Sequence, residues 1–115
     1  MPVVNLEQKL AGFCEHWSPK IIAAFNGHDV MVVKARGGFV AFPPGHGRSF
    51  LVLKGRLTIQ FRGGDVRLGP GDLHVVPKGV EHRPVADDEV HLLLMQPAGT
   101  PNTGDEATAA AKETI

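Results

Sequence analysis

The stretch GRLTIQFRGGDVRLGPGDLHVVPKGVEH, residues 55–82, decides the fold of this chain. It consists of short apolar runs, and each run stops at a turn signal: RGG at 62–64, GPG at 69–71 and PKG at 77–79. Glycine reaches positive φ without steric cost, and proline has no N–H to donate to a sheet, so both residues belong at strand ends. The stretch therefore predicts a series of short strands joined by tight turns.

The same alternation of strands and turns continues on both sides of this stretch. A helix is predicted only over residues 5–13, where Asn5 is a suitable N-cap and Gln8 follows three positions later. Short strands at this spacing indicate an all-β sandwich, barrel or jelly roll. We predict strands over 20–25, 29–35, 38–42, 49–54, 56–61, 65–68, 72–76, 82–86 and 89–97.

The composition is that of a globular domain without a charged binding surface. The 115 residues suffice for one compact domain and are too few for two. Twelve basic residues balance 12 acidic ones, which argues against a nucleic-acid partner. No apolar run approaches the roughly 18 residues of a membrane span, and no signal peptide is evident. We therefore expect a cytoplasmic protein with no membrane partner, and we interpret the single cysteine, Cys14, as a small core residue.

Residues 71–86 fit a longer pattern of fixed spacing. Five residues separate Gly71 from Pro77, and Gly79 and His82 follow at intervals of one and two residues. This arrangement resembles the second motif of the cupin superfamily, G-x5-P-x-G-x2-H-x3-N, except that Ala86 replaces the final Asn. The resemblance extends over residues 37–97.

The resemblance implies a fold and a division of the chain. The fold is the double-stranded β-helix, a jelly-roll barrel, of the small single-domain cupin 2 type. Residues 1–18 would form an N-terminal helical segment, residues 19–98 the barrel, and residues 99–115 a polar C-terminal tail. We expect the tail to be mobile or docked onto a partner subunit.

The first cupin motif, G-x5-H-x-H-x3-4-E-x6-G, is degenerate in this chain. Its closing glycine matches Gly55, and counting back six residues places Arg48 at the glutamate position. The two histidine positions fall on Phe42 and Pro44, or on Ala41 and Pro43 in the other spacing. Arginine presents only donors and a positive charge, so it repels a cation where the family holds one. We expect no metal at the usual positions and no cofactor.

Arg48 and His82 are the strongest candidates for a ligand-binding pocket. A whole motif positions His82, and Arg48 can bind a carboxylate or phosphate in bidentate fashion. An ion pair between Arg48 and an acid such as Glu81 is the alternative interpretation. The expected pocket residues are His82, Arg48, His46, Phe42 and Phe50.

Three functions remain open at this point. The first is a cupin barrel with an incomplete metal site that binds a small, anionic organic molecule. The second is a metal-dependent enzyme, of isomerase, dioxygenase or cyclase type, with one divalent ion (Fe, Mn, Ni or Zn) on rearranged ligands. His82, His46 and His74 would be those ligands, with His91 as a further candidate. The third is metal-free acid–base catalysis by His82.

The resemblance also implies a homodimer. The apolar run KIIAAF, residues 20–25, could pair across subunits and cover an otherwise exposed sheet edge.

Overall fold

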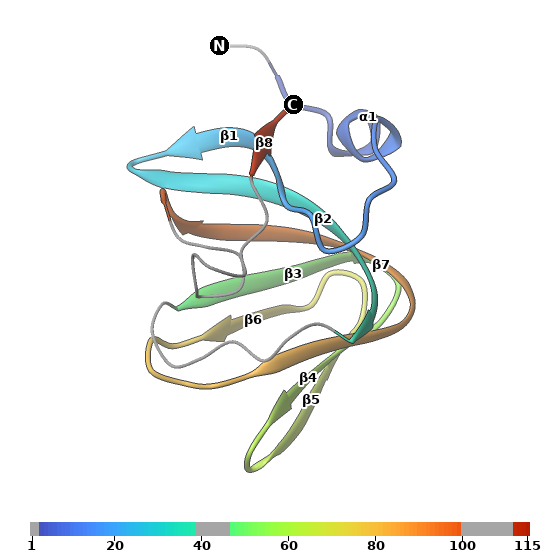
Figure 1. Ribbon diagram of the computed structural model, residues 1–115, viewed down its shortest axis with the longest axis vertical. Helices are drawn as coiled ribbons and strands as arrows, with labels where there is room; N and C mark the ends of the chain where they lie inside the picture. Colours follow the sequence, from blue (N-terminus) through green and yellow to red (C-terminus); the bar gives the residue numbers. More distant parts are fainter. Residues whose placement is uncertain (1–2, 39–46, 100–111) are drawn as a thin grey trace.

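The computed structural model describes residues 3–38, 47–99 and 112–115 (Figure 1). These residues form one short helix and eight strands, so the predicted all-β jelly roll is confirmed. The elements are α1 (Leu6–Ala11), β1 (Lys20–Phe25), β2 (His28–Gly38), β3 (Arg48–Lys54), β4 (Leu57–Phe61), β5 (Gly64–Leu68), β6 (Leu73–Val76), β7 (Arg83–Pro97) and β8 (Glu113–Thr114).

The long strand β7 belongs to both walls of the barrel. On one side it pairs antiparallel with β2 from His28↔Pro97 to Gly38↔Val85. On the other side its second half pairs with β3 and its first half with β4. Strand β6 extends the sheet beyond β3, and β5 extends it beyond β4. In Figure 1, β7 runs along the lower wall, bends, and returns in the upper wall.

The core lies between the two walls and follows the alternation of the strands. In β3 the buried positions are Arg48, Phe50 and Val52, and in β7 they continue from Val90 through every second residue. Inward side chains at every second position are what a pleated strand with one buried face produces. The buried apolar cluster consists of Met31, Val33, Ala35, Phe50, Val52, Leu57, Ile59, Leu68, Val76, Ala86, Val90, Leu92 and Leu94.

Helix α1 packs on the outside of the barrel. Its N-cap is Asn5, whose side chain accepts a hydrogen bond from the backbone N–H of Gln8 at 3.0 Å, as the sequence predicts. The helix ends at Ala11 rather than at residue 13, because Gly12 caps it through a hydrogen bond to the Lys9 carbonyl. A second apolar cluster joins the helix to the sheet: Leu10, Ile22 and Val32, with Val4, Leu6, Phe13, Val30, Leu53, Leu93 and Ile115 around them.

The end of the predicted strand series needs correction, and one predicted strand lies mostly outside the described residues. No break occurs at Asp87–Asp88, between the strands predicted over 82–86 and 89–97, because both belong to the single strand β7. A register shift between Ala35 and Gly37 lets β2 and β7 bend together at this point, so the chain changes walls without a turn. The strand predicted over 38–42 lies, after Gly38, outside the described residues.

Both ends of the described chain attach to β1. Strand β8 pairs in parallel with Lys20–Ile21 of the same chain, so residues 113–114 of the tail lie against β1. The buried Lys20 ammonium contacts Glu15 at 2.7 Å and Glu113 at 2.9 Å. The part of the β1 edge at Lys20–Ile21 is therefore occupied within the chain, and the homodimer stays a prediction.

Two smaller expectations can be compared with the structure. Cys14 is exposed, so its interpretation as a core residue is wrong, because the segment after α1 runs over the surface. Among residues 3–38, 47–99 and 112–115, no helix is long and apolar enough to cross a membrane.

Gly55 should be sensitive to substitution. It has φ +86°, and a Cβ at this position would lie 2.8 Å from the Glu89 carbonyl oxygen. We expect Gly55→Ala to lower the free energy of unfolding by about 1–3 kcal/mol, measured by urea denaturation. Gly63→Ala is the control, because no atom lies within 4 Å of its Cβ, and should change that free energy by roughly 0.5 kcal/mol at most. Equal effects of the two substitutions would contradict this prediction.

Candidate functional site

Several strands begin or end at one end of the barrel, at the left in Figure 1. Strands β2 and β3 begin there, and β6 and β7 end there. Arg48 of β3 pairs with Val76 of β6, and the next residue pairs Ser49↔Met95 with β7. One step beyond that pair, Arg48 stands beside Gln96, which pairs in turn with Asp29 of β2. The register thus places Arg48, Gln96 and Asp29 in one row across three strands.

Arg48 points into the barrel from the first position of β3. Only 4% of the residue is exposed. Burial disfavours the charged guanidinium and lowers the pKa of Arg48 to about 10. Arginine at this position, where the sequence comparison places a glutamate, gives the inner face a positive charge.

His82 also lies inside the barrel, as its place in the motif predicts. The preceding turn brings it there: Gly79 has φ +91°, and the Val80 N–H donates to the Pro77 carbonyl at 3.3 Å. His82 is 2% exposed, and its Nδ1 lies 3.0 Å from the Val80 carbonyl oxygen. A carbonyl only accepts, so Nδ1 carries the proton.

The environment of His82 favours its neutral form. Burial is the largest cause that lowers the pKa of His82, and the charges of Arg48 and His74 lower it further, against the opposing hydrogen bond to Val80. A neutral imidazole with its proton on Nδ1 presents Nε2 as an acceptor.

Aromatic rings surround His82 on the inner face. Phe50 packs against it edge-on, with ring centroids 5.8 Å apart, and Phe61 lies 6.2 Å away. Phe61 also contacts His74, whose ring centroid is 5.9 Å distant. His74 alternates with the exposed Leu73 and Val75, so it shares the inner face with Val76. Phe50 is a core residue, and Phe61 is the half-buried wall of the site.

Two depressions reach these residues from the surface. One, of about 250 Å³, is lined by Gln60, Phe61, Arg62, Glu81, His82 and Arg83. The other, of about 440 Å³, reaches Arg48 and is lined by His28, Gly47, Arg48, Ser49, Val75, Val76, Pro77, Lys78, Met95 and Pro97. Glu81 stands at the rim of the first, 3.6 Å from Arg62. The first volume lies just below the roughly 300–1,000 Å³ that is usual for small-molecule pockets, and the second lies inside that range.

Gln96 is a polar residue of the site that the sequence predictions missed. Its exposed fraction is 0%, and it follows Leu92 and Leu94 on the inner face of β7. The signal was present in the sequence, since a glutamine that continues an inward apolar alternation is unusual. Gln96 could be assigned to the site only once it was known which face of the last strand lies inside.

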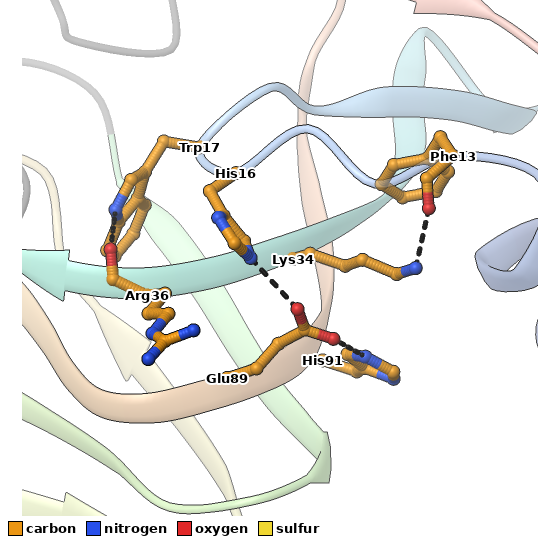
Figure 2. A network of polar contacts seen from close by, with 7 residues as sticks. All are labelled: Phe13, His16, Trp17, Lys34, Arg36, Glu89 and His91. Carbon is orange, nitrogen blue, oxygen red and sulfur yellow. Dashed lines mark hydrogen bonds and ion pairs between the residues drawn. The ribbon is translucent and has the colours of Figure 1, made fainter.

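His91 belongs to a different cluster, on the outside of the barrel (Figure 2). Its Nε2 lies 2.8 Å from one carboxylate oxygen of Glu89, and His16 Nε2 lies 2.9 Å from the other. These two hydrogen bonds lower the pKa of Glu89 to about 2. Because His16 precedes β1 and Glu89 lies in β7, the cluster fastens the N-terminal segment to the barrel, and His91 is removed from the candidate ligands of an interior metal.

Arg48, at the glutamate position of the first cupin motif, does not fit a divalent cation. Arg48 places a buried positive charge there, near enough to His82 to lower its pKa. Among residues 3–38, 47–99 and 112–115, no group of three or more His, Cys, Asp or Glu side chains is arranged to hold a metal ion. Two of the predicted pocket residues, His46 and Phe42, lie outside the described residues.

Comparison with known proteins gives the family. The cupin domain profile matches residues 30–95. A cupin-2 domain containing protein from Shewanella frigidimarina has 38% identity and a TM-score of 0.80, over 83% of this chain and 94% of that one. A Neisseria meningitidis protein has 28% identity and a TM-score of 0.74, over 84% of this chain and 100% of that one.

A more distant likeness concerns the fold alone. Hydroquinone 1,2-dioxygenase from Sphingomonas has 12% identity and a TM-score of 0.70, over 93% of this chain and 75% of that one. No match was found among curated proteins. On the profile match and the Shewanella relative, this chain belongs to the cupin family.

Proposed function

We propose that the protein binds a small organic acid at the barrel end formed by Arg48, Gln96 and His82. The observation that carries this proposal is the buried guanidinium of Arg48 on the inner face. The guanidinium presents its donors in a planar fork, and a carboxylate can bind such a fork in bidentate fashion with two charge-assisted hydrogen bonds.

The neighbours of Arg48 support a ligand with a compact carbon skeleton. Phe50 and Phe61 supply apolar contact surface on the same inner face. The neutral His82 adds an acceptor without adding a second charge beside Arg48. A charged anchor with apolar walls and few polar groups is the usual composition of a small-molecule site.

We keep the cytoplasmic location and the homodimer as proposals, and light scattering tests the second.

Arg48→Met should abolish most of the binding. The substitution keeps an unbranched apolar side chain and removes the charged guanidinium, so the barrel should still fold while the carboxylate loses its partner. Titration calorimetry with acetate, propionate and lactate should give at least a roughly tenfold loss of affinity. Arg67→Met is the control, because Arg67 is exposed on β5, and should leave affinity unchanged. Equal affinity in wild type and Arg48→Met would overturn the proposed function.

The pKa of His82 is expected below its ordinary value of 6.5. The unfolded chain then takes up the His82 proton at a higher pH than the folded chain does, so stability should fall as the pH is lowered through 6.5. NMR titration of the imidazole C–H signals measures this pKa, and the signal that disappears in His82→Gln identifies the residue. His28→Gln, at an exposed histidine, is the control. A midpoint at or above 6.5 would contradict the burial argument.

A metal-dependent enzyme is the second candidate function. It is favoured by one observation: the His74 and His82 rings both contact Phe61, so two imidazoles lie on one part of the inner face. Elemental analysis of protein purified without a histidine tag separates the two functions. The proposed function predicts no stoichiometric Fe, Mn, Ni or Zn. A metal that is present at one per chain and lost in His82→Ala would establish the second function, and the family's isomerase, dioxygenase and cyclase chemistries would become candidates.

A further inference from the structure

The side-chain amide of Gln96 is buried, and its hydrogen-bonding groups are unsatisfied. Its exposed fraction is 0%, and neither Nε2 nor Oε1 has a hydrogen-bond partner in the described part of the chain. A buried donor or acceptor without a partner costs free energy, and such groups in folded proteins are rare. The amide therefore indicates that something outside the described chain completes this site.

The position of the amide limits what that can be. Gln96 pairs with Asp29 on β2 and stands beside Arg48 on β3, one step beyond the pair Ser49↔Met95. The next inward layer is closed by the buried Phe50 and Leu94, which also pair with each other. Gln96 thus lies in the same layer as the proposed anion anchor, on the barrel-end side of Phe50 and Leu94.

The two atoms of the amide require two different partners. Nε2 donates and Oε1 accepts. A plain carboxylate offers only acceptors, so it can satisfy Arg48 and Nε2 but leaves Oε1 buried and unpaired. The ligand must therefore bring a hydrogen-bond donor next to its acid group.

The charges around the row favour a neutral donor over an ammonium group. Lys112, just before β8, interacts electrostatically with both Asp29 and Arg48, and burial lowers the pKa of its ammonium. Arg48 and Lys112 place two positive charges in this group. A ligand ammonium would add another cation to this group, whereas a hydroxyl adds none.

We propose that the ligand is a 2-hydroxycarboxylate: its carboxylate binds Arg48 and accepts from Gln96 Nε2, and its hydroxyl donates to Gln96 Oε1. This inference rests on the proposed function, since it assumes an acid at Arg48. It adds the chemical class of that acid and gives Gln96 the role of the residue that determines specificity.

Lactate and propionate test the inference as a matched pair, because they differ by a single hydroxyl. Titration calorimetry on the wild-type chain should give lactate about tenfold higher affinity than propionate. In Gln96→Met the ratio should fall to roughly twofold or less, while Gln8→Met, at an exposed helix position, should keep the wild-type ratio. Without ligand, Gln96→Met should raise the melting temperature, because it removes an unpaired amide.

The outcomes separate this inference from the proposed function. Equal binding of lactate and propionate, lost in Arg48→Met, would overturn the hydroxy acid and leave the anion site standing. Failure of both acids to bind would overturn the two proposals together. If alanine binds more tightly than lactate, the ligand's donor is an ammonium group rather than a hydroxyl, and the hydroxy acid is overturned. A lower melting temperature in Gln96→Met would indicate that a buried water satisfies the amide, which also overturns the inference. Should Gln96→Met fail to fold, the wild-type affinity ratio decides alone.

Discussion

The pairing of β7 with β2 constrains the whole barrel. One strand of 15 residues is hydrogen-bonded to β2 on one side and to β3 and then β4 on the other. The two walls therefore share a continuous ladder and cannot slide past each other, since a slip by one residue would turn every inward side chain outward. The same register that buries Leu92 and Leu94 carries Gln96 to the end of the barrel, next to Arg48. The site is thus a consequence of the pairing that forms the core.

Much of the fold could be predicted from local chemistry. Turn glycines such as Gly27, Gly71 and Gly79 do adopt positive φ, and the strands between them lie close to their expected bounds. The double aspartate at 87–88 was misread, because its polarity is typical of a turn while the opposing register shift in β2 keeps the chain extended. A bulge depends on the partner strand, so the sequence of one strand alone does not reveal it.

The candidate site was predictable in part. Motif spacing identified His82, and the count back from Gly55 identified Arg48, and both are buried. Gln96 and Asp29 were missed because they lie far from the motifs and join the site only through cross-strand register. His91 was weighed as an interior ligand because alternation does not say which face is inside, whereas the structure places it beside Glu89 on the outside.

The buried ammonium of Lys20 makes the two ends of the described chain depend on each other. Glu15 and Glu113 approach it from opposite ends of the sequence, and removing either carboxylate leaves the same charge with half of its compensation. The segment before β1 and strand β8 should therefore open in a single cooperative event rather than fray one after the other. In hydrogen exchange, the backbone amides of residues 15–21 and 113–115 should therefore show the same protection, although nearly a hundred residues separate the two segments in the chain.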